Sequence, residues 1–251
     1  MPIVDASARP RNHLLRSCCG ESFSAFESRF TRVALTPGRT LYHGRMPIEM
    51  VHFIEDGLVV TTSANETDQG PVGAWIAGRE GVVCGVPVAL GVFTSPHKRV
   101  VISRGESLAI RRADFLDLLE EVPGLRAEVL AYVHRVLVET TQLCACNARH
   151  SVRQRLARVL LTAADRLGGE DLPMTHRLTA QMLGTRRASI SDALGVFVGS
   201  GLVSLRRGAM TIVDRPALIA EACSCYGVIA RLNDGREAAG AFAGVTEGAP
   251  A

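Results

Sequence analysis

The chain has 251 residues, of which 47% are hydrophobic and 21% are charged. This composition is typical of a folded protein and excludes a largely disordered chain. The longest apolar run, from Gly81 to Phe93, is too short to cross a bilayer, and the N-terminal residues carry no basic segment followed by an apolar core. We therefore expect a cytoplasmic protein, with no membrane contact, that folds into two domains. Its seven cysteines, an odd number, are too few for a secreted disulfide framework.

The net charge of +3 is unevenly distributed along the chain. Residues 147–217 contain 11 arginines and 5 acidic residues, which leaves the rest of the chain slightly acidic. Such a basic segment is typical of a polyanion-binding module attached to a domain that does not bind polyanions. An ordinary solvated surface would give the same excess, so charge alone does not decide between the two.

The N-terminal half is predicted to be a β-rich sensor domain preceded by a helical lead-in over residues 1–32. Residues 33–122 alternate turn sequences, such as Thr36-Pro-Gly38, with short β-rich segments. Many short strands at this spacing predict an antiparallel roll and argue against a doubly wound nucleotide-binding sheet. The clearest expected strands are Met50–Ile54, Leu58–Thr62 and Lys98–Ser103.

A long helix is predicted over residues 123–146, where the apolar period changes to that of a helix. Its apolar positions recur at near-heptad steps and form a narrow seam. A seam this narrow favours pairing with a second copy of the helix in a homodimer, although burial against its own domain would give a similar pattern. The seam residues are Leu125, Val129, Tyr132, Val136 and Leu143.

Residues 147–226 are predicted to form a winged helix-turn-helix domain, followed by a C-terminal tail over residues 227–251. A helix over Ser151–Leu167 precedes a short helix that Thr175 can cap and that extends through Leu183. Gly184 provides a tight turn into a second helix over Arg186–Val198, which matches the helix-turn-helix motif. The wing is a hairpin expected from Leu202–Leu205 and Met210–Val213. The fold class is thus α+β, with an antiparallel β-roll, a dimerisation helix and a winged helix-turn-helix.

Polar side chains at the start of the second helix are candidates for DNA contacts. Arginine can donate two hydrogen bonds to guanine, and aspartate can accept one from cytosine. Positions near the helix-turn-helix entrance and the wing are suited to phosphate contacts. The expected base-contacting residues are Arg186, Arg187, Ser191 and Asp192. The expected backbone-contacting residues are Thr175, His176, Arg177, Ser189, Arg206 and Arg207.

These features together resemble the Crp/Fnr superfamily of bacterial transcription regulators over roughly Leu35 to Tyr226. The family motif of the recognition helix is similar to Gly184-Thr-Arg-Arg-Ala-Ser-Ile-Ser-Asp192, in which Arg187 matches a base-contacting arginine. Ala188 and Asp192 depart from the family pattern, which implies a different operator sequence. The segment Cys223-Ser-Cys-Tyr226 resembles the ending of one subgroup of these regulators.

The resemblance also directs attention to an effector pocket in the β-roll. Cyclic-nucleotide-binding members hold the ribose with a Gly-Glu pair, for which Arg79-Glu80-Gly81 could stand, and the phosphate with an Arg-Ser pair. Ser95-Pro96 occupies the second position and cannot neutralise a phosphodiester. We therefore expect no dependence on cyclic AMP, and the effector is unknown. The possible pocket residues are Arg79, Glu80, His97, Lys98 and Arg99.

The cysteines do not follow a familiar metal-binding spacing. Cys18-Cys19 are adjacent and cannot supply three thiolates to an iron–sulfur cluster. The pairs Cys144-Ala-Cys146 and Cys223-Ser-Cys225 could offer four sulfurs, but zinc sites usually separate paired cysteines by two residues. Small thiols without a ligand are therefore favoured, with a redox role for Cys144 and Cys146 as an alternative. No metal or cofactor is expected.

The sequence thus predicts a homodimeric regulator that binds palindromic double-stranded DNA and can contact RNA polymerase. The alternative is a small-molecule-binding signalling module whose basic domain docks a protein. A steep salt dependence of DNA binding would distinguish them. An enzyme is not expected, because no nucleophile, base and acid set and no phosphate loop appears in the sequence.

Overall fold

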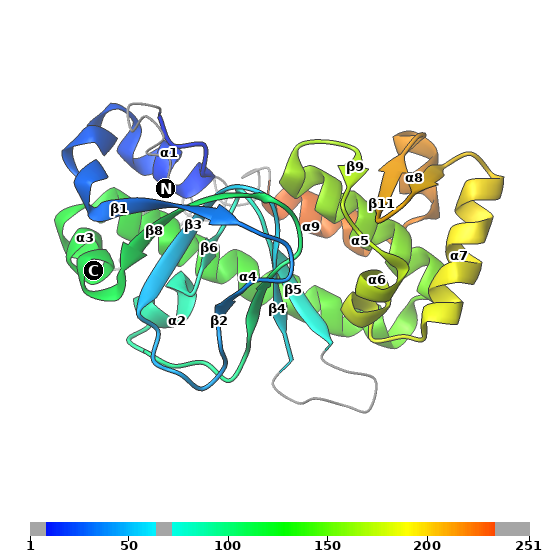
Figure 1. Cartoon of the computed structure of the whole chain (residues 1–251), viewed down its shortest axis with the longest axis horizontal. Coiled ribbons are helices and arrows are strands. Elements are labelled where there is room, and N and C mark those ends of the chain that lie inside the picture. The colour runs from blue at the N-terminus through cyan, green and yellow to red at the C-terminus, as the bar shows by residue number, and fades with distance from the viewer. Residues whose placement is uncertain (1–8, 64–71, 234–251) are drawn as a thin grey trace, which may run out of the picture.

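The computed structural model describes residues 9–63 and 72–233. A β-rich domain and a helical domain lie side by side, and the long helix α4 (Pro123–Arg149) extends from one to the other (Figure 1). Among the described residues, none of the helices combines the length and the apolarity that spanning a bilayer requires.

The N-terminal domain is an antiparallel β-roll, as predicted. Its two four-stranded sheets have the orders β1-β8-β3-β6 and β2-β7-β4-β5, and their inner faces enclose one apolar core. The three expected strands are observed as β3, β4 and β7. The bounds are β1 (Phe30–Leu35), β2 (Thr40–Tyr42), β3 (Met50–Asp56), β4 (Val59–Thr62), β5 (Gly73–Ala77), β6 (Val82–Val83), β7 (Arg99–Val101) and β8 (Gly105–Arg111).

Short helices precede the first strand of the roll, connect β6 to β7, and follow the last strand. The described part of the predicted lead-in is mostly helical from His13 to Arg29, and its last three residues already belong to β1. Asn12, just before the first helix, is buried and donates hydrogen bonds to three carbonyls of the roll. The helices are α1 (His13–Cys19), η1 (Gly20–Ala25), η2 (Glu27–Arg29), α2 (Gly85–Ala89) and α3 (Arg112–Glu121).

Helix α4 buries most of the predicted dimer seam inside its own chain. Leu125, Val129 and Tyr132 are at most 2% exposed and belong to the core of the β-roll. These three residues are therefore buried against their own domain, as the alternative interpretation predicts, and offer no surface to a dimer partner. Val136 packs against the same core but is half-buried, and Leu143 is half-buried and faces a small cleft between β5 and the next helix.

The C-terminal domain is a winged helix-turn-helix. Helix α5 begins with a capping box, in which Ser151 accepts from the Gln154 amide, and ends at Gly168 in the left-handed conformation. The final helix α9 continues seven residues past Tyr226, so the domain extends into the segment predicted as tail. The elements are α5 (Val152–Leu167), β9 (Asp171–Leu172), α6 (His176–Leu183), α7 (Arg187–Gly199), β10 (Val203–Arg206), β11 (Ala209–Ile212), α8 (Arg215–Glu221) and α9 (Cys225–Asn233).

The two domains share an apolar core and a buried ionic network. Residues of β4 and β5 pack into the same cluster as α5, α6 and α7. Beside it, the Arg166 guanidinium of α5 forms ion pairs with Glu80 at 3.0 Å and with Glu139 of α4 at 2.6 Å. Arg166 also donates to the carbonyl of Ile76. Burial opposes the charge of Arg166, but the two carboxylates outweigh it and hold the pKa of Arg166 above its ordinary value.

Replacing Arg166 tests whether this network stabilises the fold. The Arg166→Met variant leaves two carboxylates buried without a cation, and we expect the free energy of unfolding to fall by about 3–5 kcal/mol. Urea denaturation measures this value. The matched control is Arg29→Met, which removes a solvent-exposed pair with Glu121 and should change the free energy of unfolding far less. Equal costs for the two variants would contradict the assigned role of Arg166.

Candidate DNA-binding interface

The helix-turn-helix geometry follows from local sequence chemistry. Thr175 caps α6 by accepting from the Leu178 amide at 3.1 Å, as predicted. Gly184 ends α6 with φ +57°, a conformation in which glycine carries no steric penalty. Helix α7 begins at Arg187, one residue later than predicted, and Arg186 is its N-cap. The buried face of α7 is formed by Ile190, Ala193, Leu194 and Phe197.

The expected base-contacting residues lie at the start of α7 but do not share one environment. Arg186, Arg187 and Asp192 are exposed. Ser191 is half-buried, and its hydroxyl donates to the Arg187 carbonyl at 3.1 Å and lies 3.0 Å from His176 Nδ1. Ser191 and His176 therefore connect α7 to α6, which leaves the two arginines and Asp192 as the polar side chains that face solvent.

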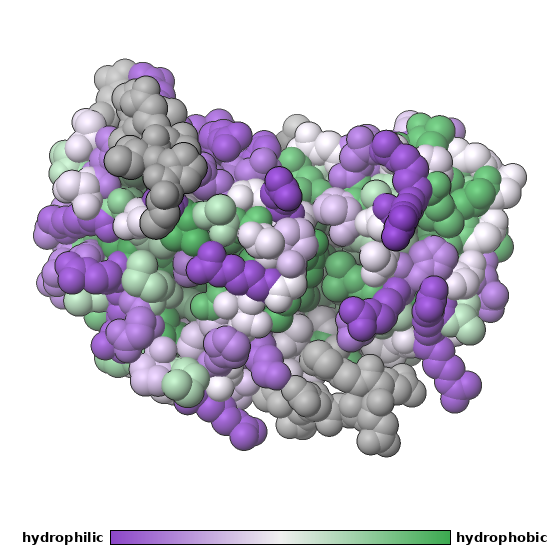
Figure 2. Space-filling model, viewed as in Figure 1, coloured by the Kyte–Doolittle hydropathy of each residue, from purple (hydrophilic) through white to green (hydrophobic). Residues whose placement is uncertain are grey.

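A groove lies between the start of α6, the start of α7 and the wing. Its volume is about 450 Å³, and five of the predicted contact residues line it: Thr175, His176, Arg177, Arg187 and Arg206. Ser189 is half-buried on α7 outside this groove. Figure 2 shows strongly hydrophilic side chains over the wing and near the start of α7. The structure thus brings most of the predicted phosphate contacts to one concave surface.

The two wing arginines differ in their partners. The hairpin turn consists of Arg207 and Gly208 and is tighter than the predicted four-residue turn. Arg206 pairs with Asp171 of β9 and donates to Thr211 at 2.9 Å. The hydrogen bond from Thr211 and the charge of Arg206 lower the pKa of Asp171, so the charge of Arg206 is already compensated. Arg207 is exposed and has no such partner in the part of the chain that the structure describes.

Comparisons with known proteins identify this domain. Residues 154–221 match the family model described as the Crp-like helix-turn-helix domain. The C-terminal domain is a Crp-like helix-turn-helix domain. No curated protein sequence matched the chain.

Solved structures show that the β-roll, α4 and the C-terminal domain together have the fold of Crp/Fnr regulators. The fold that the sequence resemblance implies is therefore confirmed. FixK2 from Bradyrhizobium japonicum is similar with a TM-score of 0.64 and 16% identity, covering 77% of this chain and 98% of FixK2. The CRP-family regulator TTHB099 from Thermus thermophilus has a TM-score of 0.63 and 18% identity, covering 76% of this chain and 96% of TTHB099. The c-di-GMP-responsive regulator CLP from Xanthomonas campestris has a TM-score of 0.62 and 15% identity, covering 77% of this chain and 99% of CLP.

Three of the five predicted effector-pocket residues, Arg79, Glu80 and Arg99, have partners within the protein. Glu80 pairs with Arg166 and accepts from the Gly78 amide, while Arg79 pairs with Asp56. Arg99 is buried, and its guanidinium donates to the carbonyls of its neighbours His97 and Lys98. Burial lowers the pKa of Arg99. With these partners, Arg79, Glu80 and Arg99 do not form a charged clamp that is open to a ligand phosphate.

The structure also reveals an exposed apolar stripe on α4 that the sequence interpretation missed. Leu130 and Leu137 are 46% and 62% exposed, and Val133, between them, is half-buried. The steps of three and four residues place these side chains on one face of the helix. The separation of seven between the two leucines was a sequence signal for this stripe, but the deeper seam carries more apolar residues and obscures it.

Proposed function

We propose that this protein is a homodimeric, cytoplasmic transcription regulator that binds palindromic DNA through α7 and does so without cyclic AMP. The observation that carries the proposal is the convergence of exposed arginines on a Crp-like helix-turn-helix. Arg186 and Arg187 stand at the start of α7, and Arg177 and Arg206 line the adjoining groove. In this motif the N-terminal residues of the second helix contact base edges in the major groove.

The contacts divide by chemistry into two groups. Arg187 lies on the first turn of α7, where a two-donor guanidinium can reach guanine O6 and N7. Arg177 lines the groove, and Arg207 follows the lining residue Arg206 at the turn of the wing. Both suit phosphate contacts, which position the domain without selecting a sequence. Because Asp171 compensates Arg206, Arg207 supplies the larger share of the charge at the wing.

Dimerisation is assigned to the exposed stripe on α4. Leu130, Val133 and Leu137 repeat at heptad spacing, and a second copy of the same helix offers the complementary stripe for a two-fold pair. An exposed apolar stripe on a helix whose opposite face is already buried favours a partner helix. Two-fold pairing places one α7 on each half of a palindrome.

Independence from cyclic AMP is inferred from the groups inside the β-roll. Glu80, the candidate for a ribose contact, is held by Arg166, and the Tyr132 hydroxyl packs so tightly on Gly81 that a Cβ there would lie 2.1 Å from it. Arg99 already donates its guanidinium hydrogens to neighbouring carbonyls. A buried cyclic phosphate would lack a charge-assisted clamp.

Substitution of the base-contacting arginine and of the phosphate-contacting arginine should weaken DNA binding in two different ways. Arg187→Ala should weaken binding to the operator selected from random duplexes by about 1–3 kcal/mol and change binding to random DNA little. Arg207→Ala should weaken both and reduce the slope of log K against log salt by about one, with a smaller effect for Arg206→Ala. Fluorescence anisotropy across salt concentrations measures these affinities. Arg111→Ala, on the β-roll, is the control and should change nothing.

Equal losses of operator affinity and of random-DNA affinity in Arg187→Ala and Arg207→Ala would show that Arg187 does not contact a base. Absence of any salt-dependent DNA affinity in the unmodified protein would instead favour docking to a protein partner.

Substitutions on the two faces of α4 should have different effects: one on the exposed stripe should break the dimer, and one on the buried face should unfold the chain. Leu137→Asp places a charge in the dimer interface, so sedimentation velocity should show a folded monomer that no longer binds the operator. Val129→Asp places a charge in the β-roll core and should destabilise the chain itself. Met46→Asp, at a similarly exposed apolar residue outside α4, should leave the dimer intact. A dimeric Leu137→Asp variant would contradict the assignment.

Cyclic AMP and cyclic GMP should neither bind nor change operator affinity. Calorimetry with each nucleotide, and anisotropy with and without it, test this directly. Micromolar binding of either nucleotide together with a rise in operator affinity would show that the β-roll rearranges to form a phosphate clamp.

A further inference from the structure

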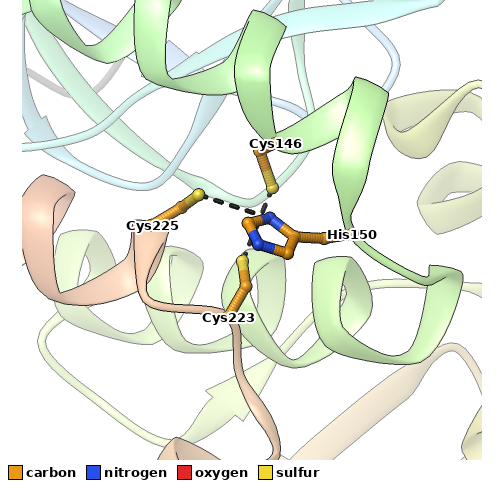
Figure 3. A group of neighbouring side chains, drawn as sticks. All are labelled: Cys146, His150, Cys223 and Cys225. Atoms are coloured by element: carbon orange, nitrogen blue, oxygen red, sulfur yellow. Dashed lines mark hydrogen bonds between the residues drawn. The ribbon is translucent and has the colours of Figure 1, made fainter.

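Three cysteines and one histidine that are far apart in the sequence meet in a buried cluster outside the DNA-binding surface. The cluster consists of Cys146 and His150 at the end of α4, Cys223 in the link between α8 and α9, and Cys225 at the start of α9. The three cysteines are at most 4% exposed, and His150 is half-buried. In Figure 3 the three sulfurs surround the imidazole ring.

The distances within the cluster fit one tetrahedral ion. All four donor atoms lie within 4.8 Å of one another. Cys146 Sγ lies 3.5 Å from Cys223 Sγ, and Cys225 Sγ lies 3.5 Å from His150 Nδ1. Zinc–sulfur bonds of about 2.3 Å at tetrahedral angles separate two thiolates by about 3.8 Å, so only small shifts are needed. Iron–sulfur clusters contain several atoms and require more widely separated ligands.

The two halves of the cluster are fixed by the backbone. Cys146 and His150 are four residues apart, and the His150 amide donates to the Cys146 carbonyl at 3.0 Å, so both side chains lie on one face of the last turn. Cys223 and Cys225 are held by the Tyr226 amide, which donates to the Cys223 carbonyl at 3.0 Å, and by the Tyr226 hydroxyl, which accepts from Arg215. The hydroxyl contact with Arg215 gives the tyrosine that follows the cysteine pair a structural role.

The electrostatic surroundings favour thiolate ligands. Arg158 is 5% exposed, and its Nε has no hydrogen-bond partner in the described part of the chain. The Arg158 guanidinium acts electrostatically on Cys146. Three thiolates, a neutral histidine and a divalent cation carry one net negative charge, which Arg158 balances. Gln142 adds a hydrogen bond to Cys225 Sγ at 3.0 Å.

We propose that Cys146, His150, Cys223 and Cys225 bind one zinc ion that fixes the end of α4 to the α8–α9 junction of the helix-turn-helix domain. The three-cysteine, one-histidine donor set with no open position is that of a structural zinc site. This donor set differs from the four sulfurs that the sequence made possible but did not favour, because Cys144 is exposed and His150 takes the fourth position. The zinc proposal is tested by measuring the metal content of the protein, so it does not depend on whether the protein binds DNA.

The first experiment measures zinc in the full-length protein, purified without an affinity tag under reducing conditions from zinc-containing medium. Plasma mass spectrometry should find about one zinc per chain in the unmodified protein. The matched control Cys144→Ser should retain it, and Cys223→Ser and Cys225→Ser should lose it. Cobalt substitution should give thiolate-to-cobalt charge-transfer absorption that is absent from the same two variants.

The second experiment uses only the unmodified protein, so its result remains decisive even if a cysteine variant does not fold. Alkylation of the unmodified protein, followed by peptide mass spectrometry, should label Cys144 at the same rate with and without a zinc chelator. Cys146, Cys223 and Cys225 should become at least about tenfold more reactive after chelation. Equal reactivity in both states, zinc retained by Cys223→Ser, or iron with acid-labile sulfide in the purified protein would overturn the proposal.

Discussion

A single buried guanidinium couples the three parts of the molecule. Arg166 belongs to α5 of the helix-turn-helix domain, and its ion pairs reach Glu80 in the β-roll and Glu139 in the long helix. Burying three charged groups is costly, and the cost is offset only while all three remain in contact. The relative placement of the β-roll, α4 and the DNA-binding domain is therefore specified by polar geometry as well as by the shared apolar core. The same contact occupies the Glu80 carboxylate, which the sequence resemblance made a candidate for a ribose contact.

The parts of the structure that were predictable from the sequence depend on residues close together in the chain. The cap by Thr175, the left-handed turn at Gly184 and the apolar face of α7 each arise within about one helical turn, so propensity and spacing suffice. The β-roll was predictable as a class because its turns are marked by proline and glycine. The strand pairing was not, and β9, which supplies the Asp171 partner of Arg206, has only two residues and no distinctive pattern.

The features that escaped prediction depend on contacts between distant segments. Helix α4 carries two apolar stripes, and the sequence does not say which one its own domain covers; the roll buries Val129, and Leu137 is left exposed. The partners of Arg166 come from positions 27 and 86 residues away, a distance at which spacing carries no signal. The thiol cluster was hidden for a similar reason, because His150 joins cysteines more than 70 residues distant, and Cys144 offered a closer but incorrect pairing.

The proposed DNA recognition combines an arginine pair at the start of α7, a wing whose charge is carried mainly by Arg207, and two copies of the domain arranged by α4. Selection of binding sites from random duplexes with the purified 251-residue protein tests that combination most directly. We expect an inverted repeat whose half-sites are centred about one helical turn, or a multiple of it, apart, with guanine at the position lost from the consensus in Arg187→Ala. Enrichment of a single unrepeated site, or no enrichment over random DNA, would contradict it.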